Sequence, residues 1–193
     1  MGKFDVEKTA IPGLMLITPK PICDERGWFL RTFAAEELSG CGIDHTTLVE
    51  ANHSRSHRGV VRGLHTRADT REAKLIRVPR GRVFDVVVDL RPTSPAFGRW
   101  LGFELDDETH RQLYIPGGCA HGFQALSALA DVCYQVTAAY EPSLDAAVAW
   151  DDPDLAVRWP LADATVSARD RAAPRLAEIR PELDAWFGAA DVA

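Results

Sequence analysis

Long apolar runs and an excess of positive charge are both missing from this sequence. No stretch approaches the ~18 consecutive apolar residues of a membrane-spanning helix, and the opening MGKFDVEKTAIPGL lacks the apolar core of a signal peptide. The formal net charge is −6, whereas surfaces that bind nucleic acids normally carry a basic excess. We therefore expect a soluble, cytoplasmic protein with neither a membrane nor a nucleic-acid partner.

Cysteine is sparse and irregularly spaced. Cys23, Cys41, Cys119 and Cys133 form neither the CxxC pairs of zinc sites nor a dense disulfide framework. A chain of 193 residues can bury a sizeable core without disulfides. We expect reduced thiols and, because no repeat, linker or low-complexity segment interrupts the chain, a single domain over residues 1–193.

The middle of the chain alternates short apolar runs with turn residues. Gly, Pro and Asp recur every eight to twelve residues, and the runs between them are rich in Val, Ile, Leu and aromatic residues, which is typical of an all-β protein. The nine predicted strands are Gly13–Thr18, Thr47–Asn52, Gly59–Leu64, Lys74–Val78, Val83–Leu90, Trp100–Leu105, Gln112–Ile115, Gly122–Ala125 and Val132–Thr137. No long helix intervenes, so the pattern favours an antiparallel sandwich or small barrel.

Helical patterns are confined to two segments. The shorter covers Ala34–Ser39, and the longer runs from about Ala173 to Phe187, where apolar residues recur every three to four positions. We expect both helices to be peripheral to the β fold.

The stretch VVRGLHTR, residues 60–67, ends an apolar run in a histidine with an arginine on either side. A neutral imidazole can accept a proton near physiological pH, and guanidinium groups can hold an anionic substrate beside it. A packed histidine would give the same eight letters, so this stretch alone leaves both interpretations open.

A metal site is the first chemistry to test in a small β-barrel with histidines. The segment YIPGGCAHGF contains the P-x-G-x-x-H core of the second cupin motif, ending at His121, but Ala125 stands where that motif has asparagine. The first motif needs His-x-His, and here Arg67 replaces the second histidine after His65. Arginine has no lone pair for a metal, so we predict no metal and no cofactor, and a metal-dependent cupin enzyme stays a minor alternative.

Seven longer blocks stand in order along the chain. They are DERGWF (24–29), ANHSRSHRGVVRGLH (51–65), AKLIRVPRGRVFDVVVDLR (73–91), SPAFGRW (94–100), RQLYIPGGCAHGF (111–123), WDDPDLAVRWP (150–160) and SARDRAAP (167–174). Together, over roughly residues 10–175, they resemble the dTDP-4-dehydrorhamnose 3,5-epimerase family, and so many ordered matches rarely arise by chance. The resemblance implies an all-β, cupin-type jelly roll with a few peripheral helices, free of metal and assembled as a homodimer.

The chemistry that the resemblance implies is inversion of carbons beside the ketone of a nucleotide-linked sugar, most simply a dTDP-4-keto-6-deoxyhexose. Inversion removes a C–H proton to give an enolate and returns a proton to the opposite face, which requires a base, an acid across the ring and a cation for the enolate oxygen. His65 matches the family's base, Asp170 its orienting partner and Tyr134 its proton donor. Lys74 matches the lysine beside the enolate, and it is the only lysine after Lys20.

The resemblance also assigns substrate-binding positions. Four residues match contacts with the diphosphate or the sugar, namely Arg26, Asn52, Arg62 and His121. Tyr140 matches the tyrosine that stacks on the nucleobase. Asp145 and Arg169 stand where the family usually has glutamate and lysine, so both charges are kept.

Three departures from the family pattern lie on the substrate side. Arg31 replaces the usual glutamate and Glu50 the usual glutamine, so the two could pair with each other or could select a different base. After the predicted base, Thr66 and Arg67 replace the usual aromatic residue and glutamine, which alters the floor or rim of the pocket.

These departures leave the particular substrate open. The alternatives are an epimerase that inverts only C3 or only C5, a relative that uses another nucleotide sugar, and a non-catalytic cupin that binds nucleotide sugars. Retention of His65, Asp170 and Tyr134 together favours an enzyme, because binding alone needs no base opposite an acid.

Overall fold

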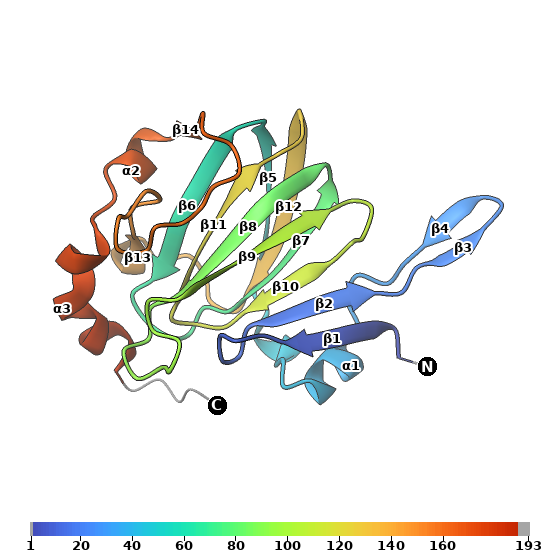
Figure 1. The fold of residues 1–193 in the computed structure, drawn as a ribbon. Helices are drawn as coiled ribbons and strands as arrows, with labels where there is room; N and C mark the ends of the chain where they lie inside the picture. The colour runs from blue at the N-terminus through green and yellow to red at the C-terminus, as the bar shows by residue number, and fades with distance from the viewer. Residues whose placement is uncertain (1, 189–193) are drawn as a thin grey trace.

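The computed structural model describes residues 2–188, and two sheets packed face to face form its body (Figure 1). The first sheet has six antiparallel strands in the order β1-β2-β10-β7-β12-β5. Their bounds are β1 Phe4–Lys8, β2 Met15–Pro19, β10 Gln112–Ile115, β7 Lys74–Arg80, β12 Leu129–Val136 and β5 Glu50–His57. Most neighbours in this sheet are distant in sequence, as in a jelly roll.

The second sheet follows the order β13-β6-β11-β8-β9, and β14 pairs with β6 in parallel. Their bounds are β13 Asp145–Ala147, β6 Val60–Arg67, β11 Cys119–Ala125, β8 Arg82–Asp89, β9 Trp100–Asp106 and β14 Thr165–Val166. Because β6 and β11 are hydrogen-bonded neighbours, the two histidine-bearing motifs of the sequence lie side by side in one sheet.

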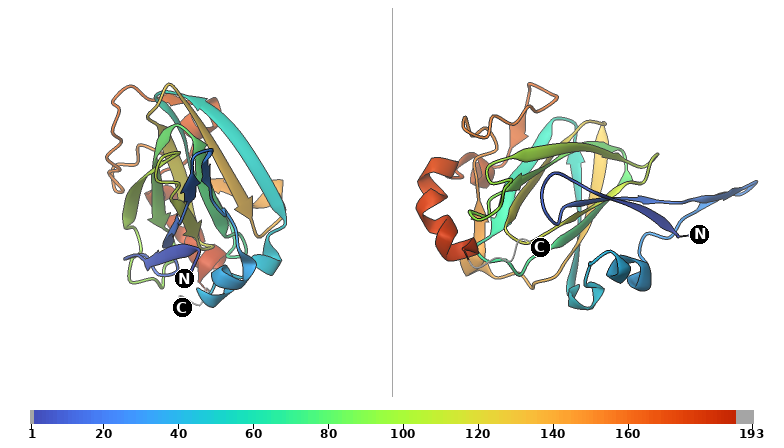
Figure 2. Two further views of the ribbon diagram at one scale, coloured as in Figure 1. Left: turned by 90° about the vertical axis from the view of Figure 1, so that its right-hand side faces the viewer. Right: turned by 60° about the horizontal axis from the view of Figure 1, so that its bottom comes forward.

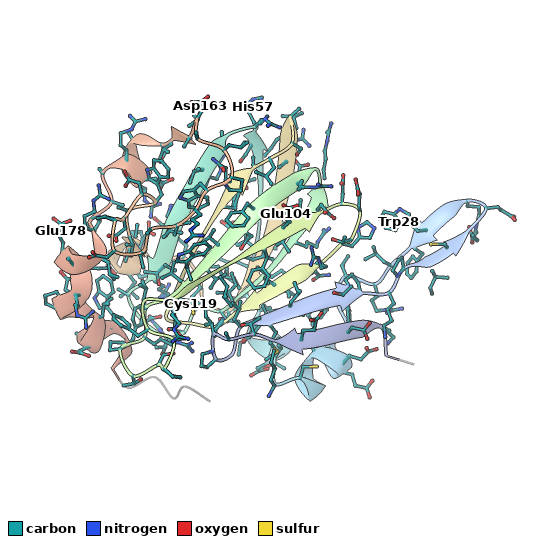
Figure 3. All side chains as sticks on the ribbon, in the orientation of Figure 1. Trp28, His57, Glu104, Cys119, Asp163 and Glu178 are labelled. Carbon is teal, nitrogen blue, oxygen red and sulfur yellow. The ribbon has the colours of Figure 1, made fainter. Side chains whose placement is uncertain are left out.

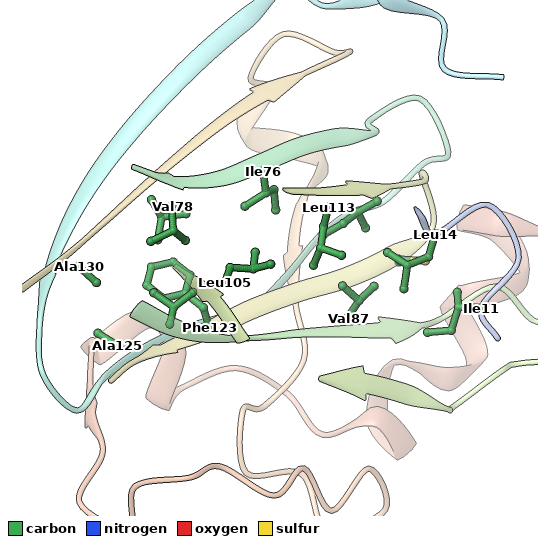
Figure 4. Close-up of a cluster of buried hydrophobic side chains, with 14 of the residues drawn as sticks. Ile11, Leu14, Ile76, Val78, Val87, Leu105, Leu113, Phe123, Ala125 and Ala130 are labelled. Atoms are coloured by element: carbon green, nitrogen blue, oxygen red, sulfur yellow. The ribbon is translucent and has the colours of Figure 1, made fainter. Parts of the chain in front are cut away.

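Aliphatic side chains fill the space between the sheets (Figure 4). Ile76 and Leu113 of the first sheet meet Val87 and Leu105 of the second, and all four are fully buried. Successive residues of a strand point to opposite faces, so only alternate residues of each strand enter this core. Burial of these side chains fixes the spacing of the two sheets.

The outer face of the second sheet is covered by C-terminal helices (Figure 1). Helix α3, Leu176–Phe187, packs its buried apolar residues against Val86 and Val88 of β8, and the short helix α2, Ala168–Arg171, precedes it. Strand β8 is therefore buried on both faces, which explains its nearly continuous apolar sequence VFDVVVD.

A hairpin of β3, Ile22–Asp24, and β4, Gly27–Phe29, projects from the body of the protein (Figures 1 and 2). It exposes large apolar side chains, with Ile22 69%, Trp28 59% and Phe29 61% exposed; Trp28, labelled in Figure 3, lies near the body, where its ring centroid is 4.4 Å from that of His110. The remaining elements are helix α1, Ala35–Gly40, and the 3-10 turns η1, His45–Thr47, and η2, Pro142–Leu144. Within residues 2–188, no helix has the length and apolar character needed to cross a bilayer.

All nine predicted strands correspond to strands of the structure, but some boundaries were wrong. The strand predicted from Thr47 begins at Glu50, because a 3-10 turn occupies the start of that segment. The strand predicted to end at Leu64 continues through Arg67, since β6 pairs there with β13 and β11. His65 therefore lies inside a strand rather than after one. The long helix begins at Leu176, after Pro174, rather than near Ala173.

Candidate active site

A cavity of about 330 Å³ opens between the two sheets. Strands β5, β7 and β12 line one wall, and strands β6, β11 and β13 line the other. Ten of the thirteen residues predicted from the sequence line it, namely Glu50, Asn52, Arg62, His65, Lys74, His121, Tyr134, Tyr140, Asp145 and Arg169. The fold thus gathers into one pocket residues that are spread over most of the chain.

His65 is hydrogen-bonded to Asp170, with 2.6 Å between Nε2 and Oδ1. Asp170 is 4% exposed and sits in the first turn of α2, where its backbone N–H donates to the Ser167 hydroxyl that caps the helix. Burial lowers the pKa of His65 below its ordinary value, and the hydrogen bond and charge of Asp170 partly offset this effect. The outcome is an imidazole that is neutral at neutral pH, held in a fixed orientation and able to accept a proton.

A second histidine–aspartate pair lies next to the first. His121 is the direct partner of His65 in the β6–β11 pairing, and its Nε2 lies 2.9 Å from Oδ2 of Asp85 on β8. Asp85 is fully buried, and burial raises the pKa of its carboxyl. Within residues 2–188, its Oδ1 has no hydrogen-bond partner. Sequence reasoning missed Asp85, although a lone carboxylate in the apolar run VFDVVVD was a usable signal.

Two glycines explain how the histidine strands come so close. Gly63 has φ +136°, and a Cβ built on it would lie 2.5 Å from the Cα of Gly122. A Cβ on Gly122 would in turn lie 2.7 Å from the carbonyl oxygen of Arg62. The β6–β11 register shifts at this point, between the pairs made by His121 and Phe123. Only glycine permits this contact, which brings His65 and His121 opposite each other.

The opposite wall carries the predicted acid and cation. Tyr134 on β12 and Lys74 on β7 both belong to the first sheet, and the Lys74 ammonium is paired with the carboxylate of Glu72. Burial raises the pKa of Tyr134, the charge of Glu72 adds to the rise, and Arg62 opposes it. Tyr134 therefore stays protonated over the physiological range and can donate a proton. Glu72, which also lines the pocket, was not anticipated from the sequence.

The pocket mouth carries most of the remaining predicted residues. Arg62 donates from Nε to the Ser56 hydroxyl at 3.0 Å, which fixes its guanidinium on β6. Arg169 pairs with Asp145 at 2.6 Å, and the Tyr140 hydroxyl lies 3.4 Å from the same carboxylate. The substitutions at positions 145 and 169 thus keep an ion pair.

The residues that depart from the family pattern take specific places. Thr66 is buried and donates to the carbonyl oxygen of Cys119, so it ties β6 to β11. Within residues 2–188, no ion pair joins Arg31 to Glu50. Glu50 accepts a hydrogen bond from the backbone N–H of Tyr140. Arg67 is buried and donates a hydrogen bond to the carbonyl oxygen of the preceding residue, Ala139.

Two predicted binding residues lie outside this pocket. Arg26 sits at the turn of the projecting hairpin and pairs with Asp24, and Arg31 is exposed just after β4. Neither residue lines the cavity. For metal ions, residues 2–188 hold no group of three or more His, Cys, Asp or Glu side chains that could act as ligands.

The fold and the pocket together define a cupin-type jelly roll whose site is suited to proton transfer, with an imidazole–carboxylate pair facing a phenol and an ammonium. Comparison with known proteins agrees. A profile of the family described as dTDP-4-dehydrorhamnose 3,5-epimerase matches residues 8–178. The enzyme of that name from Salmonella typhimurium is 44% identical over 176 residues, which cover 89% of this chain and 94% of the relative.

Two further relatives bear on substrate and outcome. The dTDP-4-dehydrorhamnose 3-epimerase of Streptomyces niveus is 42% identical over 171 residues, which cover 88% of this chain and 83% of that protein. The crystal structure of a 3,5-epimerase from Legionella pneumophila, in complex with dTDP-4-keto-L-rhamnose, superposes with a TM-score of 0.88 at 43% identity, covering 93% of this chain and 96% of the other. This chain belongs to the dTDP-4-dehydrorhamnose 3,5-epimerase family, and it is an isomerase with the predicted all-β fold.

Proposed function

We propose that this protein epimerises a dTDP-4-keto-6-deoxyhexose at C3 and C5 in deoxysugar biosynthesis. The observation that carries the proposal is the His65–Asp170 pair on one wall of the pocket with Tyr134 and Lys74 on the other. A sugar ring between these walls meets a base on one face and an acid on the opposite face, which is what inversion beside a ketone requires.

The proposed reaction begins when neutral His65 removes the C–H proton next to the C4 ketone. The bonding electrons move into the carbonyl, and the ammonium of Lys74 stabilises the enolate oxygen that forms. Asp170 stabilises the imidazolium. Tyr134 then gives its proton to the carbon from the other face, and the enolate returns to the ketone. The His65 imidazolium loses its proton to water and the Tyr134 phenolate takes one up from water, which restores both groups for the next inversion. These steps use groups of this chain and water, so the mechanism requires neither a metal nor a cofactor.

The nucleotide assignment rests on the outer pocket. Tyr140 offers an exposed ring for a base, and Arg62 offers a fixed guanidinium for phosphate oxygens. The Legionella relative was crystallised with a dTDP-sugar, which supports dTDP as the carrier. The Streptomyces niveus relative, a 3-epimerase of similar identity, makes inversion of C3 alone the second candidate.

The protein is further proposed to be a single-domain, cytoplasmic homodimer. The exposed apolar side chains of the hairpin, Ile22 and Phe29 on one face and Trp28 on the other, would be covered by a second copy of the chain. Arg26 lies at the turn of this hairpin and Arg31 just after it, so docking would carry these predicted phosphate contacts towards the partner's pocket. The substitution Trp28→Asp tests this idea, because it should lower the sedimentation coefficient to that of a monomer.

One experiment tests the reaction itself. The protein is incubated with dTDP-4-keto-6-deoxyglucose in deuterated water, and the label is located by NMR. Deuterium at both C3 and C5 supports double epimerisation, and label at C3 or C5 alone selects the single-centre reaction. Absence of label from both carbons removes this substrate.

A further inference from the structure

The peptide group that joins Ala139 to Tyr140 is held from both sides by charged side chains. Its carbonyl oxygen accepts a hydrogen bond of 2.8 Å from Nη1 of Arg67. Its N–H donates to Oε1 of Glu50 at 3.2 Å. Both groups belong to one planar unit, so the two bonds together fix the tilt of that plane at the residue from which the Tyr140 ring extends.

The two side chains come from different sheets. Glu50 is the first residue of β5 and Arg67 is the last residue of β6. The Ala139–Tyr140 peptide is thus hydrogen-bonded to both walls of the pocket, through Glu50 on one wall and Arg67 on the other. Both side chains also line the cavity, as does the Tyr140 ring.

Arg67 is itself held rigidly. Its side chain is 8% exposed, and its Nε lies 3.0 Å from both oxygens of Asp69. Asp69 also pairs with Arg71 at 2.7 Å, and these arginine contacts lower the pKa of Asp69 despite its partial burial. A buried, charge-paired guanidinium presents Nη1 to the Ala139 carbonyl in one fixed direction.

The Tyr140 ring is not fixed by packing. It is 65% exposed, and within residues 2–188 the one hydrogen-bond contact of its hydroxyl is the 3.4 Å contact to Asp145. An exposed ring that must stack on a base loses conformational entropy on binding unless its backbone is already oriented. The bonds to Glu50 and Arg67 supply that orientation before the ligand arrives.

We propose that Glu50 and Arg67, two of the residues that depart from the family pattern, are positioning residues that preorganise Tyr140 for the nucleobase. The inference rests on the proposed function, since it takes Tyr140 as the stacking residue. Glu50 and Arg67 then raise the affinity for the nucleotide through Tyr140. Arg67 does so by its hydrogen bond to the Ala139 carbonyl oxygen and not by binding a phosphate.

Calorimetric titration with dTDP tests the proposal. Glu50→Ala and Arg67→Met should each weaken binding by about tenfold, the effect of losing one charge-assisted hydrogen bond. If only the charge of each side chain mattered, the two variants would change the affinity in opposite directions. Loss of the acidic Glu50 near a diphosphate would strengthen binding, and loss of the basic Arg67 would weaken it. Tighter binding by Glu50→Ala would overturn the proposal. Arg71→Met is the matched control, since Arg71 also pairs with Asp69 but does not line the pocket, and its affinity should stay within about twofold of wild type.

A double-mutant cycle separates the positioning role from direct phosphate binding. In a Tyr140→Ala background, Arg67→Met should have almost no further effect if Arg67 acts through Tyr140, whereas full additivity would show direct contact with the ligand. Thermal melting shows whether each variant is folded. If Arg67→Met fails to fold, Glu50→Ala still tests the Ala139–Tyr140 peptide, because Glu50 is exposed and its replacement leaves the core intact. Loss of affinity in Tyr140→Ala with none in the Glu50 and Arg67 variants contradicts the positioning role. Unchanged affinity in Tyr140→Ala contradicts the nucleotide assignment instead.

Discussion

His65 and His121 stand directly opposite each other on neighbouring strands, and each ring is hydrogen-bonded to its own buried aspartate. The two pairs are not equivalent. The His65 side chain is 34% exposed towards the pocket, whereas that of His121 is 10% exposed. His65 is therefore the more accessible imidazole, as the proposed role of base requires, and the proposed role of His121 is to hold the sugar.

Removing either member of the first pair should abolish the reaction. His65→Ala removes the proposed base, and Asp170→Ala removes the carboxylate that orients the His65 ring. Each substitution should therefore lower the rate of deuterium incorporation by about 10²- to 10⁴-fold. The double variant should be scarcely slower than either single variant, because the two residues act as a unit. Near-normal exchange in His65→Ala would contradict the mechanism.

The pH dependence of kcat/KM should show an acid limb below pH 6.5, the ordinary pKa of histidine, because burial lowers the pKa of His65 in the free enzyme. Asp170→Asn takes away the charge that raises this pKa. The acid limb should then move to still lower pH while the plateau rate falls. A limb that moves upward in Asp170→Asn would show that another group is the base.

Tyr134→Phe should separate proton removal from proton return. His65 on the opposite wall still forms the enolate, so wash-in of solvent deuterium without inversion should persist while inverted product declines. NMR of the recovered sugar measures both in one sample. Loss of wash-in and inversion in equal measure would mean that Tyr134 is needed for enolate formation or for packing.

Glu72→Gln should shift the alkaline limb of the reaction. The charge of Glu72 contributes to the raised pKa of Tyr134, so its removal lets that pKa fall towards the ordinary value of 10.0. The rate should then decline at lower pH than in the wild type. Glu141→Gln is the control, since Glu141 also lines the pocket but accepts from Ser143, and its profile should be unchanged.

Gly63→Ala should destabilise the fold by about 2 kcal/mol or more, because the new Cβ meets the backbone of β11 in addition to an unfavourable positive φ. Gly27→Ala separates these effects. Gly27 has a similar φ of +124° but nothing within 4 Å of a built Cβ, so its cost should be backbone strain alone. Denaturant unfolding measures both. Equal losses would show that the Gly63–Gly122 contact is not tight.

Local pattern predicted the central strands and helix α3, because burial on one or both faces leaves a clear apolar period in the sequence. It did not predict the edge strand β1, Phe4–Lys8, whose residues are mostly exposed. The same reasoning explains the site. His65 and Tyr134 were recognised from motifs, but Asp85 and Glu72 were missed because their partners are set by strand register and by neighbouring loops, which no short motif encodes.

The core between the sheets also determines the stereochemistry of the proposed reaction. His65 and Tyr134 are anchored to different sheets, and sheets in a sandwich pack ~10 Å apart, so the gap between the proposed proton acceptor and proton donor depends on the thickness of the hydrophobic layer. Ile76 and Leu113 act as spacers in that layer, and neither of them lines the pocket. Thinning it by a large-to-small substitution would bring donor and acceptor closer to each other and change how each one meets its own face of the ring, so the mixture of stereoisomers released would change although no residue of the pocket had been altered.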